Sequence, residues 1–291
     1  MASAAHLSQQ QTAEEKPGDW THDHHRHSLS RQMTVALTPE QYEKLFFQPN
    51  QAKGDLAKRL GNPTLLGLLG FLIPFTNTMF ACCGFQGSST ASLASIIGGW
   101  YFFGGIAMVL AGICEFILGN TFPFVVFGIY GTHWVAQAYT NDPWHPLTAA
   151  YGTGPEVAVD LAYTSGQGLY NVVMLLVSFV FTIGSLRTNV PFVITFVALD
   201  FLFGFFAAAN FQLGHNPTPD GIAYADKLFL IAGGFGMVSC IMGWYLAIIT
   251  VCASTGVPCP LPIFDLSTKL FRDSGAKTNE HAGSVRETVN G

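Results

Sequence analysis

Six long apolar segments that carry almost no charge constrain the fold of this chain more than any other feature. Each segment is close to the roughly 20 residues that a helix needs to cross a bilayer. Between residues 62 and 255 the basic residues are Arg187 and Lys227 alone. Because lipid offers no partners for backbone polar groups, such segments predict transmembrane helices. They run approximately over Leu65–Phe85, Leu93–Leu118, Phe122–Tyr139, Leu169–Leu186, Val190–Phe211 and Leu228–Ala253.

The composition agrees with an all-α integral membrane protein built as a six-helix bundle. Only 11% of the 291 residues are charged and 49% are hydrophobic, whereas soluble domains carry about 25% charged residues. The chain lacks the basic clusters that nucleic-acid binding requires. We see no nucleophile motif, phosphate loop or metal-ligand spacing, and the six cysteines do not form a zinc pattern. We therefore expect neither an enzyme nor a bound cofactor or metal.

The pattern divides the chain into four parts. Residues 1–36 are polar and predict a disordered cytoplasmic tail. Residues 37–61 predict a short amphipathic helix and a polar connector, in which Thr38 caps the helix. Residues 62–264 form the membrane domain, and residues 265–291 form a second cytoplasmic tail.

Basic residues near the ends of the six segments predict the orientation. Cytoplasmic loops carry an excess of Lys and Arg. With six spans, every basic cluster but Lys227 falls on one side, so both termini are expected in the cytoplasm. These clusters are Lys53, Lys58 and Arg59 before the first span, Arg187 between the fourth and fifth, and Lys269 and Arg272 after the sixth.

The second and third segments predict a tight helical hairpin. Gly98, Gly105, Gly112 and Gly119 recur every seventh residue and fall close to one stripe of the second helix. Since lipid gives helices no hydrophobic reason to associate, small residues allow close backbone packing instead. We expect this glycine stripe to be buried against another helix, within the subunit or in a homo-oligomer. The turn then begins at Gly119.

Two acids lie inside the apolar segments, where a charge costs at least about 2.5 kcal/mol at the bilayer centre. Glu115 lies near the cytoplasmic end of the second span. It could exchange a proton beside a carboxylate substrate, or it could pair with Arg187 or with the amides of the next helix start. Asp200 lies near the expected midplane of the fifth span, where it could face the pathway or bond to a neighbouring helix.

Two helix starts could attract an anion. Asn120 and Thr121 open the third span, and Asn62 and Pro63 open the first. Exposed amides at such helix termini favour negative charge. Simple helix initiation explains the same residues.

The first segment begins Asn62-Pro63-Thr64-Leu65-Leu66-Gly67-Leu68, and the hairpin contains Phe103-Gly104-Gly105-Ile106-Ala107, Ala111-Gly112-Ile113-Cys114-Glu115 and Gly119-Asn120-Thr121-Phe122. These motifs resemble the signatures of the acetate and succinate transporter family, in the family's order. The resemblance covers about residues 62–264. Leu65, Met108 and Ile129 are apolar where the family pattern has proline, glutamine and serine.

The resemblance implies a six-helix protomer, often assembled as a hexamer, that carries small monocarboxylates with a proton or as a channel. It places Asn62 and Pro63 near the substrate. It implies an aromatic constriction, for which Phe85, Tyr130 and one of Phe203, Phe205 and Phe206 are candidates. We expect uptake of acetate or a similar acid, with a plasma-membrane location. A passive channel for small acids, ammonia or neutral solutes, and an acetate sensor without transport, are the alternatives.

Overall fold

In a computed structural model of the chain, residues 60–145, 147–152 and 154–266 can be described, and all of their regular elements are helical. The expected tail over residues 1–36, nearly all of the 37–61 segment and the tail beyond residue 266 lie outside the described residues. The all-α expectation is confirmed for the described part. Expectations for the two tails stay untested.

Within the described residues, five stretches are long and apolar enough to cross a membrane. They are α4 (Thr64–Cys82), the continuous run Thr90–Ile117, α8 (Leu161–Ser185), α9 (Val190–His215) and α10 (Pro219–Thr255). A further helix, α7 (Thr121–Asn141), has 21 residues. It is less apolar than the five because threonine, asparagine, glutamine and histidine side chains interrupt its sequence.

The second stretch is not a uniform helix. It begins as the 3₁₀ turns of η2 (Thr90–Ile96) and the short α5 (Ile97–Gly99). It then widens into the π-helical η3 (Trp100–Ala107) and ends as α6 (Met108–Ile117). Because a π-turn holds more residues than an α-turn, this segment rotates later side chains relative to a regular helix.

Two helices start well before the apolar segments predicted for them. The helix expected from Leu169 begins at Leu161, where the carboxylate of Asp160 accepts the N–H of Tyr163 at 2.9 Å. The helix expected from Leu228 begins at Pro219, capped by the Thr218 hydroxyl, which accepts the N–H of Gly221 at 3.2 Å. Because these caps stabilise a helix start within polar sequence, both helices extend beyond the apolar segments from which their bounds were predicted. The connection between α7 and α8 is therefore shorter than the gap between the two predicted segments, and it contains η4 (Leu147–Ala150) and η5 (Pro155–Val159).

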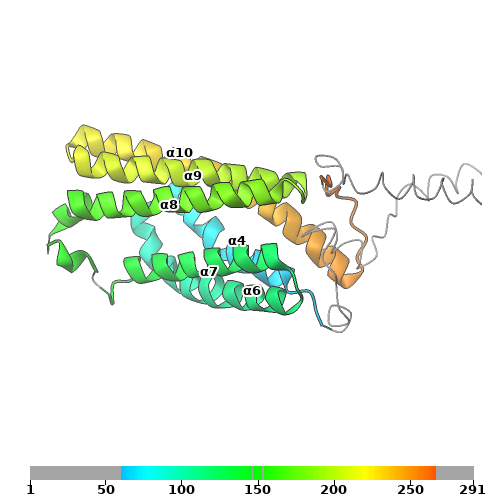
Figure 1. The fold of residues 1–291 in the computed structure, drawn as a ribbon. Helices are drawn as coiled ribbons and strands as arrows, with labels where there is room; N and C mark the ends of the chain where they lie inside the picture. Colours follow the sequence, from blue (N-terminus) through cyan, green and yellow to red (C-terminus); the bar gives the residue numbers. More distant parts are fainter. Residues whose placement is uncertain (1–59, 146, 153, 267–291) are drawn as a thin grey trace, which may run out of the picture. The chain divides into compact units, whose positions relative to one another are not determined.

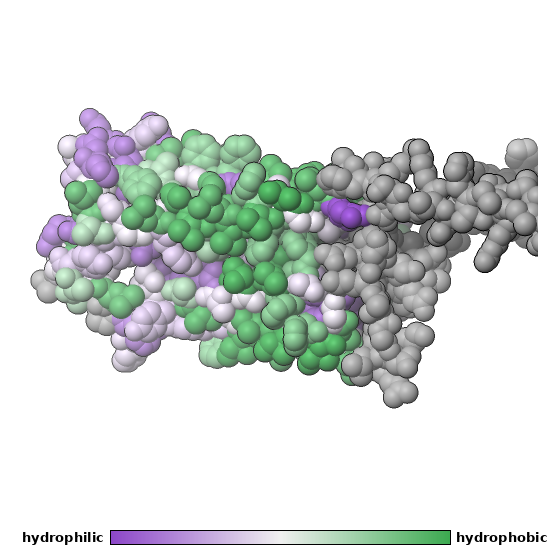
Figure 2. Space-filling view, in the orientation of Figure 1, coloured by the Kyte–Doolittle hydropathy of each residue, from purple (hydrophilic) through white to green (hydrophobic). Residues whose placement is uncertain are grey.

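The helices pack in two groups joined by α4. Helices α8, α9 and α10 lie side by side, while α6 packs along α7, and α4 contacts both α10 and α6 (Figure 1). Apolar side chains cover much of the visible flanks, with polar side chains gathered at the end that carries the α7–α8 connection (Figure 2). Helices α6 and α8 each expose a row of large apolar side chains, including Phe116, Leu110, Leu176 and Val180. Such a surface suits lipid.

The glycines of the hairpin behave differently from one another. A Cβ on Gly112 would lie 3.2 Å from the backbone N of Gly128 and the carbonyl of Phe124, so α6 and α7 touch through their backbones there. Gly105 lies against Val135 of α7. Around Gly98 and Gly119, by contrast, no described atom lies within 4 Å of such a Cβ. Within the subunit, Gly105 and Gly112 are therefore the two glycines of the expected stripe that lie against another helix.

The reason for this difference is local. The π-helical η3 lies between Gly98 and Gly112 and changes the seven-residue register. Gly119 ends the helix with φ +81°, a left-handed conformation that glycine adopts without strain. Outside the predicted stripe, Gly104 of η3 lies against Trp134, and Gly131 of α7 lies against Val109 of α6.

Candidate solute pathway

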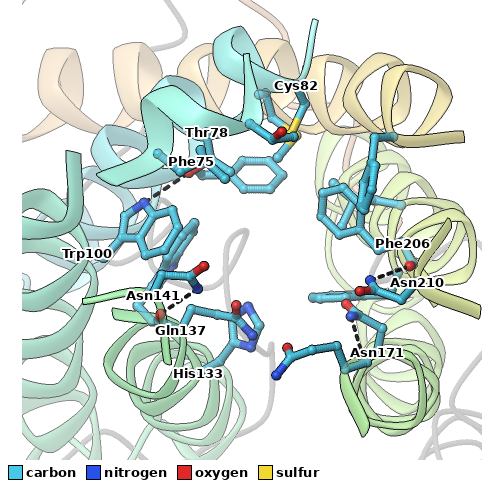
Figure 3. A pocket seen from close by; sticks show the side chains of 18 of the residues that line it. Phe75, Thr78, Cys82, Trp100, His133, Gln137, Asn141, Asn171, Phe206 and Asn210 are labelled. Carbon is cyan, nitrogen blue, oxygen red and sulfur yellow. Dashed lines mark hydrogen bonds between the residues drawn. The ribbon is translucent and has the colours of Figure 1, made fainter. Parts of the chain in front are cut away.

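A cavity of about 300 Å³ lies inside the helix bundle, at the end where α7 stops and α8 begins. Figure 3 shows side chains from the surrounding helices directed toward this space. We call it the vestibule. One part of its wall is aromatic and the other carries amides. The aromatic part includes Phe71, Phe75, Trp100, Tyr130, Trp134, Phe203, Phe206 and Phe229.

The amide part of the wall comes from three helices. Gln137 and Asn141 lie on α7, Gln167 and Asn171 on α8, and Asn210 on α9. The side-chain N–H groups of Asn141, Asn171 and Asn210 each donate to the carbonyl four residues earlier, at 2.8 Å (Figure 3). An amide has two N–H donors and one oxygen acceptor, so this helix bond leaves each asparagine a second N–H and its oxygen for a solute.

His133 also faces the vestibule, and it is held in place by its neighbours. Its Nδ1 lies 2.8 Å from the hydroxyl of Tyr170, and the two rings are stacked with centroids 5.7 Å apart. Trp134 and Phe203 contact the same imidazole edge-on. Hydrogen bonding and packing thus fix the imidazole of His133 in the cavity wall.

A second, smaller cavity of about 30 Å³ continues toward the opposite end of the bundle. Its wall is apolar except for Tyr130 and Thr195. Both cavities are lined by Phe71, Tyr130 and Leu199, so these three side chains stand between them. They come from α4, α7 and α9, and 9%, 3% and 2% of their surfaces are exposed. We call this trio the apolar neck.

Tyr130 is fixed in the neck by α8. Its hydroxyl is 2.7 Å from the hydroxyl of Ser178, which is fully buried. Its ring packs edge-on against Phe181 and stacks on Phe196. A buried tyrosine that has a partner for its hydroxyl costs little to hold in one rotamer. The neck is therefore defined by packing and not by a mobile loop.

The aromatic residues proposed from sequence for a constriction have separate places. Tyr130 lies in the neck, and Phe206 lines the vestibule. Phe85 lines neither cavity. It lies half exposed in η1 (Phe85–Gly87) and packs on Phe80 with ring centroids 4.9 Å apart. The reason is that α4 ends at Cys82 and Gly84, at φ +72°, turns the chain before Phe85.

Glu115 is fully buried and lies away from both cavities. Its Oε1 accepts the hydroxyl of Thr64 at 2.6 Å, and its Oε2 accepts the side-chain N–H of Asn120 at 2.6 Å. The carboxyl group thus ties the end of α6 to the starts of α4 and α7. We call these three residues the carboxyl clasp. The bond to Asn120 joins Glu115 to the next helix start, and it is made by the side chain of Asn120.

The remaining sequence candidates near this end serve as helix starts. The carboxamide oxygen of Asn62 accepts the N–H of Thr64 at 2.9 Å, and Pro63 occupies the cap position of α4. Asn120 is the cap residue of α7 and Thr121 its first residue. None of Asn62, Pro63, Asn120 and Thr121 lines either described cavity.

Asp200 faces α8 and not the vestibule. Its Oδ2 accepts the hydroxyl of Thr182 at 2.8 Å, while Oδ1 is buried without a hydrogen-bond partner. The neighbouring residue Leu199 points into the neck. Of the two roles considered from sequence, the bond to a neighbouring helix is the one that the geometry contains.

At the end of α7, next to the vestibule residue Asn141, Asp142 anchors the chain. Its carboxylate accepts the N–H of Trp144 at 2.9 Å and the hydroxyl of Tyr101 at 3.2 Å, and lies 3.4 Å from His145. The N–H of Trp144, followed by the Tyr101 hydroxyl and His145, lowers the pKa of Asp142. The carboxylate is therefore ionised at this rim of the bundle.

Phe71, Leu199 and the amides are site residues that only the structure reveals. Phe71 and Leu199 are apolar residues in apolar helices, so no local signal marks them. The amides do carry one. Gln137 and Asn141, like Gln167 and Asn171, are spaced by four residues and share one face of a helix.

Comparison with known proteins identifies the family. Residues 46–268 match the family model described as the GPR1/FUN34/yaaH family. Protein alcS of Aspergillus fumigatus is 36% identical over 243 residues, which cover 80% of this chain and 86% of that protein. Acetate permease A of Emericella nidulans is 25% identical over 211 residues, covering 72% and 67%.

A solved structure described as the bacterial acetate channel SatP shares the fold. Its TM-score is 0.54 at 24% identity, and the match covers 70% of this chain and 99% of that one. The family suggested by the motifs at Asn62 and in the hairpin is thereby confirmed, and the chain belongs to the GPR1/FUN34/yaaH family.

Proposed function

We propose that this protein transports acetate or a similar small monocarboxylate across a membrane, together with a proton. The observation that carries the proposal is a vestibule and a smaller cavity separated by an apolar neck within one subunit. Relatives named acetate transporter protein patA, from Aspergillus clavatus, and acetate permease A support acetate as the solute.

The dimensions favour a small solute. The cavity beyond the neck, at about 30 Å³, is of the order of a few water-sized positions. A solute with four heavy atoms needs little rearrangement of Phe71, Tyr130 and Leu199 to pass, whereas each further methylene group requires more. The neck thus selects by size and by weak hydration.

The proposed assembly follows the sequence and the family. We place α7 across the membrane as the sixth span, beside the five more apolar stretches, with both termini in the cytoplasm. The vestibule then opens on the outer side. A plasma-membrane location and a homo-oligomer, hexameric by family resemblance, complete the proposal.

We assign different tasks to the two ends of the subunit. The vestibule, the neck and Phe206 contact the solute. The carboxyl clasp, with Asn62, Pro63 and Thr121, holds the helix starts at the cytoplasmic end. Gly105 of η3 and Gly112 of α6 keep these elements close to α7, and Asp200 joins α8 to α9.

Labelled-acetate uptake into proteoliposomes over a range of pH tests this function. We expect uptake that rises with an inward proton gradient and is reduced by other short acids. Leu199→Trp, which fills the neck, is the blocked control, and a folded L199W protein should show no uptake above protein-free vesicles. Equal fluxes in wild type, L199W and protein-free vesicles would refute the proposal.

A passive channel is the second candidate, because the apolar neck holds no carboxyl, imidazole or amino group that could bind and release a proton. The same vesicles separate the two. Protein-dependent accumulation of acetate at the expense of a proton gradient excludes a channel that passes the acetate anion alone, whereas simple equilibration of acetate would indicate such a channel.

A further inference from the structure

The lining of the vestibule and neck has a chemistry that bears on the form of the solute. Among the described residues that line the two cavities, Asp, Glu, Lys and Arg are absent. The ionisable side chains in the lining are those of His133, Cys82, Tyr130 and Tyr163. A carboxylate that enters would therefore meet amide and hydroxyl groups, an imidazole and a thiol, but no lysine or arginine.

The described acids that adjoin lining residues in the sequence offer an anion no attraction either. Asp200 follows the neck residue Leu199, and Asp142 follows the vestibule residue Asn141. The basic residues of the described part are Arg187, in the α8–α9 connection at the opposite end from the vestibule, and Lys227, whose side chain is exposed on α10. Anion pores commonly use rings of Arg or Lys. This route has none among its described residues.

The amides match an uncharged acid better than its anion. A carboxylic acid has one O–H donor and one carbonyl acceptor, which pair with the oxygen and the N–H of an amide. A carboxylate only accepts, so it would leave the amide oxygens of the wall unpaired. Beyond the vestibule the solute must pass the aromatic and aliphatic neck, where an unpaired charge is costly.

We infer that the vestibule and neck take the solute in uncharged form, as the undissociated acid, and admit neutral isosteres of it such as acetamide. This inference rests on the proposed function and names the substrate form for the same site. The coupled proton is then carried by the acid itself. No side chain of the route has to hold it.

Proteoliposomes of the full-length protein test this with two probes, acetamide and labelled acetate. Protein-free vesicles supply the background, which matters because undissociated acids also cross lipid. We expect acetamide flux well above that background. We also expect protein-dependent acetate uptake to change less than about twofold when a potassium diffusion potential of about 100 mV is imposed. For a solute with one elementary charge, the same potential would change the equilibrium concentration ratio across the membrane about fifty-fold.

Variants of the wall provide an internal check. In Asn171→Asp and His133→Gln, acetate and acetamide fluxes should rise or fall in the same proportion, because both solutes use the same uncharged contacts. A His133→Gln protein that loses acetate flux but keeps acetamide flux would show that a protonated imidazole holds an anion, and would overturn the inference.

The outcomes separate this inference from the proposed function. Acetate uptake that follows the membrane potential, with no acetamide flux, would overturn the inference and leave acetate transport standing. Absence of protein-dependent flux of both probes would overturn both. Acetamide flux that L199W abolishes, with acetate uptake insensitive to voltage, is the expected result.

Discussion

The carboxyl clasp provides the sharpest test of how this bundle is held together. In Glu115→Ala, the Thr64 hydroxyl and the Asn120 amide lose the acceptor that now lies 2.6 Å from each. Thr64 is 2% exposed and cannot turn to water, whereas Asn120 is partly exposed. A buried polar group left without its partner costs about 1–3 kcal/mol, so the two together should cost roughly 2–5 kcal/mol.

This loss should be visible in thermal unfolding. A domain of about 200 residues loses roughly 2–4 °C per kcal/mol, so Glu115→Ala should lower the apparent melting temperature by roughly 4–20 °C. Tryptophan fluorescence of the detergent-solubilised protein can follow unfolding, at one fixed scan rate because membrane proteins often unfold irreversibly. Glu115→Gln keeps one oxygen acceptor and the side-chain volume, so it should fall between Ala and wild type.

A double-mutant cycle with Thr64→Val isolates the contact. If Glu115 and Thr64 interact directly, T64V should cost less in the E115A background than in wild type, by about 0.5 kcal/mol or more. An apparent melting temperature of E115A within about 2 °C of wild type, or the same cost of T64V in both backgrounds, would refute the clasp.

Three further predictions concern packing, pH and size selection. Gly112→Val should force α6 and α7 apart, since even a Cβ there would lie 3.2 Å from backbone atoms of α7, and should reduce folded yield, whereas Gly234→Val, with open space around it, should not. The hydrogen bonds of Asp142 lower its pKa below the ordinary value of 3.8. The stabilisation that they give is therefore present above that pH and is lost as the pH falls through the lowered pKa. Asp142→Asn should make the melting temperature less dependent on pH between about pH 2 and 5. Leu199→Ala should widen the neck and raise propionate and butyrate uptake relative to acetate in the flux assay, and an unchanged ratio would count against selection at the neck.

The ends of the helices show which boundaries the local sequence predicts and which it does not. Gly119, at φ +81°, ends α6, and Thr121 begins α7, as the residue types at that turn predict. The starts of α8 and α10 differ from prediction because Asp160 and Thr218 cap them in polar sequence. Both cap residues are visible in the sequence, but a prediction from the length of the apolar segments does not take them into account.

The sequence by itself determined that the chain forms long apolar helices with a tight turn at Gly119, and it identified the family through motifs that surround Glu115. Only the tertiary structure decided that Phe71, Tyr130 and Leu199 meet in one neck, that amides of three helices face one vestibule, and that Glu115 joins three helix ends. The physical reason lies in the solvent. In lipid, outward and inward faces of a helix are both apolar, so hydrophobic periodicity does not distinguish them. Which apolar side chain borders a cavity is then set by the packing of helices distant in the sequence.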